Sequence, residues 1–109
     1  MLTFKQKSNW IINNQVRIAK VEKAVIALEE AINKAEAHKS CVDYNFHKEL
    51  GLFSGTPAEY NQLFAKHEAD IIKCCNTIDD AIVKRSRLNS LKTKLVRHEK
   101  VIFALPHTW

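Results

Sequence analysis

One stretch, residues 11–35, constrains the fold more than any other. Its residues recur at alternating steps of three and four without a slip, and all but one of them are apolar. The positions are Ile11, Asn14, Ile18, Val21, Val25, Leu28, Ile32 and Ala35. This spacing is typical of a helix that lies along another helix, as in a coiled coil. We call such a row a seam, and it predicts a long first helix.

The second half of the chain contains a similar seam, which predicts a second long helix. Its members are Tyr60, Phe64, His67, Ile71, Cys74, Ile78 and Ala81, followed by Leu88, Leu91, Leu95, His98 and Ile102. The pattern slips near Lys84 and Arg85, which indicates a kink, a stutter or the start of a separate helix. Asn89-Ser90 is a second candidate break. The helix is therefore either continuous or broken between residues 84 and 90.

Local signals set the expected ends of the first helix. Thr3 and Gln6 have the spacing of a capping box, so we expect this helix to run from about residue 4 to residue 40. Residues 41–56 form the expected connection. Within it, residues 43–50 are either a short separate helix or a continuation of the first one.

The second helix has the clearest start signal in the chain. Thr56 is the expected N-cap, Pro57 occupies the first helical position, and Glu59 completes a capping box. Just before them, we expect Gly55 to adopt the left-handed turn conformation that glycine favours. The helix is expected over residues 57–103, with an apolar tail, residues 104–109, that folds back onto it.

These elements predict an all-α protein, a long antiparallel helical hairpin or helical bundle with coiled-coil-like seams. A chain of 109 residues with two glycines and two prolines suits a single helical domain. A lone hairpin leaves apolar surface uncovered, so either breaks fold the chain into a three- or four-helix monomer or two hairpins pair as a homodimer. We favour the dimer. Its expected core is Ile11, Ile18, Val21, Val25, Leu28, Ile32, Phe64, Ile71, Ile78, Leu88, Leu91 and Leu95.

Asn14 is the polar member of the first seam, and two interpretations stay open. A buried asparagine at such a position fixes the register or oligomeric state of paired helices. Alternatively, this end of the helix is frayed and the side chain is hydrated.

Composition bounds the cellular setting. No run of residues is long and apolar enough to cross a membrane, and the first residues are too polar for a signal peptide. Cys41, Cys74 and Cys75 are odd in number and two are adjacent, which does not suit a disulfide framework. We expect reduced, mostly buried thiols, a cytoplasmic protein and no membrane association.

The net charge of +5 is unevenly distributed. Residues 1–27 carry five basic and one acidic side chain, residues 84–100 carry seven and one, and residues 28–83 carry five and ten. In a hairpin the two basic segments meet, and we call them the basic pole. Its candidate partner-binding residues are Lys84, Arg85, Arg87, Lys92, Lys94, Arg97, Lys100, Arg17 and Lys20. Aromatic residues nearby, Phe4, Trp10, Phe103 and Trp109, either add to a binding surface or pack the helix ends together.

The predicted function is macromolecular binding without catalysis. We expect an adaptor, regulator or inhibitor that binds a protein partner, of a kind common in phages and plasmids. The alternative is a nucleic-acid-binding regulator that uses the basic pole. On a helical wheel the basic residues of 84–100 spread around the helix, and no recognised nucleic-acid-binding motif accompanies them.

A third alternative is a small metal-binding or catalytic bundle. His38 and Cys41 share one helix face, and His67, Cys74 and Cys75 fall opposite them in a hairpin, so a zinc site is conceivable. The spacing matches no known zinc finger, and a packed thiol or imidazole needs no metal. The adjacent pairs Asp79-Asp80 and His98-Glu99 point apart on a helix and lack a nucleophile. We therefore expect no metal, no cofactor and no enzyme activity.

Overall fold

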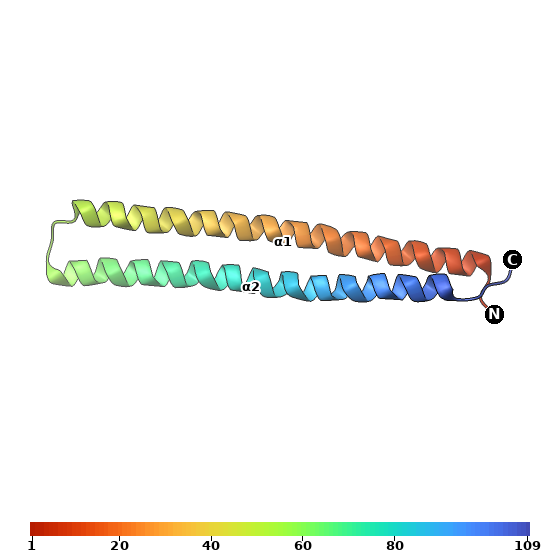
Figure 1. Cartoon of the computed structure of the whole chain (residues 1–109). Helices are drawn as coiled ribbons and strands as arrows, with labels where there is room; N and C mark the ends of the chain where they lie inside the picture. The colour runs from red at the N-terminus through yellow and green to blue at the C-terminus, as the bar shows by residue number, and fades with distance from the viewer. The chain divides into compact units, whose positions relative to one another are not determined.

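The computed structural model describes residues Met1–Trp109 and contains two helices. α1 spans Phe4–Leu52 with 49 residues, and α2 spans Pro57–Ala104 with 48. The two helices lie side by side and run antiparallel, with no strand between them (Figure 1). This confirms the all-α antiparallel helical hairpin.

The hairpin divides into two compact units. We name Met1–Leu28 with Lys84–Trp109 the terminal unit, because it holds both chain ends, and Glu29–Val83 the turn unit. Each unit pairs a segment of α1 with an antiparallel segment of α2, so each has its own part of the seam.

α1 is longer than the bounds expected from its end signals. Helix was expected to about residue 40 with a connection over residues 41–56, but α1 continues to Leu52, and only residues 53–56 connect it to α2. The open alternative of a continuous first helix is therefore correct. The physical reason is that the seam continues beyond Ala35 through half-buried Val42 to buried Phe46, so the helix still has an apolar stripe to cover.

α2 is also continuous, so neither candidate break between residues 84 and 90 is used. Since both helices are unbroken, the chain does not form the three- or four-helix monomer that breaks would allow. The row that faces α1 keeps one phase throughout: Ala81, Arg85, Leu88, Lys92, Leu95, Glu99 and Ile102 are all buried or half-buried. Arg85 occupies the inward position of this row at which the apolar pattern first slips.

Two residues that were expected on the second seam do not face α1. Leu91 and His98 were placed on it, but Leu91 is 43% exposed and His98 is exposed, while Lys92 and Glu99 take the inward positions. In a continuous helix paired with another helix, the inward-facing positions recur every 3.5 residues on average unless the helix is locally over- or underwound. Residue 92 therefore faces α1, and Leu91 beside it faces outward.

The remaining seam positions differ in burial. Val21, Ile32 and Ile78 are buried, Phe64 is exposed, and a larger group is half-buried: Ile11, Ile18, Val25, Leu28, Ile71, Leu88 and Leu95. The few other buried apolar side chains, Phe46, Cys74 and Ile102, lie on the same rows. Each unit thus has a narrow core, as two helices alone can form.

The predicted capping box at Thr3 is complete, and the one at Thr56 is half formed. The backbone N–H of Gln6 donates to Thr3 Oγ1 at 3.1 Å, and the N–H of Thr3 donates to Gln6 Oε1 at 3.0 Å. At the start of α2, the N–H of Glu59 donates to Thr56 Oγ1 at 3.3 Å, and the Thr56 hydroxyl lies 3.2 Å from Glu59 Oε1. These bonds satisfy backbone donors that the first helical turns leave free.

Gly55 does not adopt the left-handed conformation, and its nearest neighbours are side-chain atoms. No glycine in the chain has a positive φ, which corrects the expected turn geometry. A Cβ atom at Gly55 would instead lie 2.8 Å from Glu59 Oε2 and 3.0 Å from the ring of Phe53. The connection is therefore tight because the capping carboxylate and the aromatic ring close over it.

The tail folds back, as expected, and closes the terminal unit. Thr108 pairs with the N-terminal segment through two backbone bonds: Phe4 N–H donates to Thr108 O at 2.7 Å, and Thr108 N–H donates to Leu2 O at 2.9 Å. The Trp109 ring stacks on Phe4 with centroids 4.7 Å apart. These two aromatic residues of the basic pole therefore pack the helix ends.

Lys7 caps the end of α2 from the opposite helix. Its Nζ donates to the carbonyls of Phe103 at 2.8 Å and Leu105 at 2.9 Å, and lies 3.5 Å from His107 Nδ1. The last turn of α2 contains no basic residue of its own. Lys7 supplies the positive charge that the carbonyl end of a helix favours.

Candidate interaction surfaces

The candidate basic residues all lie in the terminal unit, but they do not form one surface. Arg85 and Lys92 are half-buried on the seam. Lys92 Nζ forms an ion pair with Glu22 at 3.1 Å, and this pair bridges α2 and α1. Arg97 and Lys100 are exposed on other sides of α2. These four residues therefore do not share a face with the remaining five.

The other five candidates gather on one side of the helix pair, which we call the basic face. It consists of Arg17 and Lys20 on α1 with Lys84, Arg87 and Lys94 on α2. Lys84 and Arg87 border a groove of about 580 Å³ between the helices, whose remaining lining is apolar: Ala24, Ala27, Leu28 and Leu88. The small alanine side chains leave this groove open, and the basic residues stand at its edge.

A second groove continues the basic face toward the chain ends. It has a volume of about 430 Å³ and is lined by Trp10, Asn13, Asn14, Arg17, His98 and Ile102. Trp10 is 50% exposed beside Arg17, and the exposed Leu91 and Val101 lie on the same side of α2 by helical spacing. Large apolar side chains thus alternate with basic ones. Trp10 is the aromatic residue that lines this groove, and Phe103 is exposed elsewhere at the same end of the hairpin.

The basic face contains no carboxylate. The terminal unit has twelve lysines and arginines but only two acidic residues, Glu22 and Glu99. Glu22 lies two residues after Lys20 and Glu99 lies five after Lys94, so they point about 160° and about 140° away from these lysines. Glu22 pairs with Lys92, and Glu99 accepts a hydrogen bond from Gln15 at 2.9 Å. The positive charge of the basic face is therefore not neutralised within the unit.

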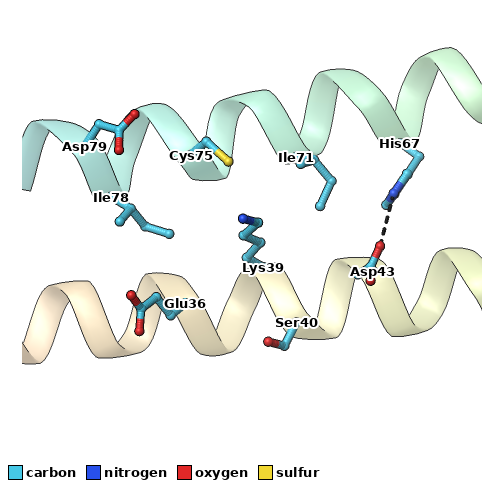
Figure 2. Close-up of a pocket in the computed structure, with 9 residues that line it drawn as sticks. All are labelled: Glu36, Lys39, Ser40, Asp43, His67, Ile71, Cys75, Ile78 and Asp79. Carbon is cyan, nitrogen blue, oxygen red and sulfur yellow. Dashed lines mark ion pairs between the residues drawn. The ribbon is translucent and has the colours of Figure 1, made fainter.

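The turn unit has a groove of the opposite character, shown in Figure 2. Its volume is about 620 Å³, and it is lined by Glu36, Lys39, Ser40, Asp43, His67, Ile71, Cys75, Ile78 and Asp79. Three carboxylates border it, while Lys39 extends into the space between the helices (Figure 2). This groove was not predicted from the sequence. The seven-residue repeat of Glu29, Glu36 and Asp43, which places these carboxylates on one side of a helix, is the sequence signal that could have indicated it.

His67 closes one end of this groove through contacts with α1. Its ring stacks on Phe46 with centroids 3.8 Å apart, and its Nε2 lies 3.3 Å from Asp43 Oδ1. His47 Nε2 lies 3.7 Å from the same carboxylate oxygen. Histidine was expected on the α2 seam at residue 67, and its position is explained by packing and a carboxylate contact.

The other candidate chemical residues do not assemble. No group of three or more His, Cys, Asp or Glu side chains is arranged to hold a metal ion. Cys74 is buried, Cys75 half-buried and Cys41 exposed, and all three are free thiols, so the expectation of mostly buried thiols does not hold for Cys41. His98 lines the groove beside Trp10, whereas Glu99 contacts Gln15 on another side. Neither helix has a stretch apolar enough to cross a membrane.

Comparison with known proteins finds no family model that matches the chain, and no curated protein or solved structure that is similar to it.

Proposed function

We propose that this chain is a non-enzymatic protein-interaction module, an adaptor, regulator or inhibitor that binds its partner through the basic face of the terminal unit. The observation that carries the proposal is the composition of this face. Basic side chains border an open apolar groove, and no carboxylate lies among them. Such a surface suits a helix or segment that presents apolar residues flanked by acidic ones.

The apolar component favours a protein partner over nucleic acid. Binding to a phosphate backbone needs only the positive charges. Here, Trp10, Leu91 and Val101 are exposed between them, and burial of apolar surface is the main driving force of protein association. Tryptophan and arginine, which line the second groove at Trp10 and Arg17, are also the residues that most often dominate the energy of protein interfaces.

Nucleic-acid binding is the second candidate, and the excess of twelve basic over two acidic residues in the terminal unit favours it. A salt titration tests this candidate. Counterion release gives a steep loss of affinity with salt, so true binding to duplex DNA should still be measurable at physiological ionic strength and show a defined log–log slope. Loss of all binding at that salt concentration would contradict it.

Site-specific photo-crosslinking tests the proposed function. A photoreactive side chain at Leu91, on the basic face, should produce discrete protein adducts in cells that express the chain. The same side chain at Ser90, which is exposed but points about 100° away, is the matched control. Adducts to nucleic acid at Leu91 would favour the second candidate, and equal yields at both positions would contradict a specific interface.

We also propose a cytoplasmic setting. Three free cysteines, one of them exposed, support a reducing environment. Labelling of Cys41 by a thiol reagent in freshly lysed cells checks this, since a modified or oxidised Cys41 would remain unlabelled.

A further inference from the structure

We propose that the partner segment bound by the basic face is an acidic amphipathic helix of about three seven-residue repeats, supplied by another protein. This helix would lie along the groove between α1 and α2 and complete a three-helix bundle. Its apolar stripe would face the groove, and its carboxylates would flank the stripe on both sides. The inference rests on the proposed function and names the partner of the same surface, all of which belongs to the terminal unit.

The basic face repeats every seven residues on both helices. Two inner rows follow the grooves between the helices: Trp10, Arg17 and Ala24 on α1, and Lys84, Leu91 and His98 on α2. Two outer rows flank them with the same step: Asn13, Lys20 and Ala27 on α1, and Arg87, Lys94 and Val101 on α2. Seven residues advance a helix by about two turns, or about 10 Å. A third helix repeats its own inward side chains at this interval, whereas an extended segment repeats every two residues.

The helix pair leaves its core open on this side. Leu28 and Leu88 are seam residues, but both are only half-buried and both line the first groove. The neighbouring Ala24 and Ala27 are too small to cover them. A large apolar side chain of a third helix would pack against both leucines, as ridges pack into grooves in helical bundles.

The two grooves determine where the partner needs large apolar side chains. The first groove lies at Ala24 and Lys84 and the second at Trp10 and His98, so they are fourteen residues apart along each helix. This separation is about 21 Å on a helix. A partner helix that fills both grooves therefore needs apolar anchors about fourteen residues apart. Leu91 lies midway between the grooves in its row and would contact the middle repeat of the partner.

The charges on the basic face select an acidic partner. Arg17 and Lys20 stand on the α1 side, and Lys84, Arg87 and Lys94 stand on the α2 side, with no carboxylate among them. A helix between these two sets would have positive charge on both flanks. Opposite charges beside an apolar stripe determine which helices pair, as they do in coiled coils.

A synthetic peptide tests the inference. The probe has about 21 residues, with leucine at the two inward positions of each seven-residue repeat and glutamate at the positions that flank them. One control peptide has the same composition in scrambled order, so it keeps the charge and loses the stripe. A second control replaces each glutamate with lysine. Fluorescence anisotropy measures binding of the labelled peptides, and circular dichroism measures helix formation.

The acidic peptide should bind the wild-type chain one to one and become helical on binding. It should bind at least about tenfold more tightly than the scrambled peptide, because only a continuous stripe places apolar side chains in both grooves. The lysine peptide should not bind measurably, since it brings like charges together on both flanks.

Charge reversal on the chain tests the position of the peptide. Lys84→Glu with Arg87→Glu should weaken binding about a hundredfold. The control variant, Lys23→Glu with Arg97→Glu, makes the same charge change on the outer side of the same unit and should bind like the wild type. All four side chains are exposed and form no ion pair, so both variants should fold, which circular dichroism checks.

A matched pair of apolar substitutions tests the contact between the grooves. Leu91→Gln should weaken binding of the acidic peptide about tenfold, because the partner helix would remove this side chain from water. Val16→Gln is the control, since Val16 is 48% exposed against 43% for Leu91 but is not on the basic face. It should leave binding unchanged.

Equal binding of the acidic and scrambled peptides, or equal binding by the face variants and their controls, would overturn the inference. Self-association of the wild-type chain that excludes the peptide would also overturn it and assign the face to a second copy. These failures are distinguishable from failure of the proposed function. A chain that does not bind the acidic peptide but gives a discrete protein adduct from Leu91 would remove the helical partner and leave the interaction module intact.

Discussion

The side-chain amide of Asn14 on α1 donates a hydrogen bond to the main-chain carbonyl of Leu95 on α2, at 2.8 Å. Asn14 is only 2% exposed, which excludes the frayed and hydrated interpretation of this end of the helix. The carbonyl of Leu95 also accepts the regular helical bond from residue 99, so the contact adds a second donor to an acceptor that is already paired. The Asn14 Oδ1 atom is buried and has no partner.

Asn14→Leu should stabilise the chain. The substitution removes a buried unpaired oxygen and leaves the carbonyl of Leu95 with its helical bond, so we expect the free energy of unfolding to rise by about 1–2 kcal/mol. Asn14→Asp should lower it by about 2 kcal/mol or more, because a carboxylate would face a carbonyl oxygen in a buried site. Urea unfolding of the two variants at neutral pH measures both effects. A leucine variant as unstable as the aspartate variant would show that the hydrogen bond is essential for packing.

Lys7→Met should destabilise the terminal unit. The methionine keeps the apolar part of the side chain but removes the two hydrogen bonds to the last carbonyls of α2 and the favourable charge at the helix end. We expect a loss of about 1–2 kcal/mol in the free energy of unfolding. Lys5→Met is the control, since Lys5 is exposed and makes no such contact, and it should change stability by less than about 0.5 kcal/mol. Equal effects of the two substitutions would rule out the capping role.

The two glycines should respond in opposite ways to alanine. Gly51 lies in the last turn of α1, where an added Cβ would meet nothing within 4 Å, so Gly51→Ala should stabilise by about 0.5–1 kcal/mol through helix propensity. At Gly55, the added methyl group would meet Glu59 Oε2 at 2.8 Å and the Phe53 ring, so Gly55→Ala should destabilise. Thermal unfolding of both variants gives the comparison. A Gly55→Ala variant at least as stable as the wild type would show that the capping carboxylate moves without cost.

Two isoleucines on α1 allow the stability contribution of a buried apolar side chain to be compared with that of an exposed one. Ile32 is 6% exposed and Ile26 is 57% exposed. Ile32→Ala should cost about 2–5 kcal/mol, because it removes buried methyl groups and leaves a cavity. Ile26→Ala should cost less than about 1 kcal/mol, as expected for a surface position. Chemical denaturation at low protein concentration keeps association from contributing. A loss at Ile26 as large as that at Ile32 would contradict the surface position of Ile26.

Much of the local structure could be predicted from sequence because its causes act within a few residues. The N-caps at Thr3 and Thr56 join groups three positions apart, and the structure contains both, with the full reciprocal box at Thr3. The seam at Val21 and Ile32 follows from helical periodicity alone, and both side chains are buried. The helical hairpin could be predicted from two such seams and the short connection between them.

The errors arose where a residue's environment depends on side-chain contacts that periodicity does not reveal. Leu91 is a better seam residue than Lys92 by hydropathy, but Lys92 faces α1, where its ammonium group pairs with Glu22. Gly55 was assigned a special backbone conformation, whereas its constraint is contact with Phe53 and Glu59. The Lys92–Glu22 contact joins residues that sequence spacing does not bring together, whereas the contacts of Gly55 are local but depend on how two neighbouring side chains are oriented.

By itself, then, the sequence determined the two helices, their caps and most of the faces that they bury, because backbone hydrogen bonding and apolar periodicity are local properties. Tertiary structure alone decided that Lys7 caps α2, that Trp109 stacks on Phe4, and that five of the basic residues gather around an alanine-lined groove. These contacts join residues far apart in the chain. Their formation depends on the register in which the helices pair, and that register minimises the energy of both helices together.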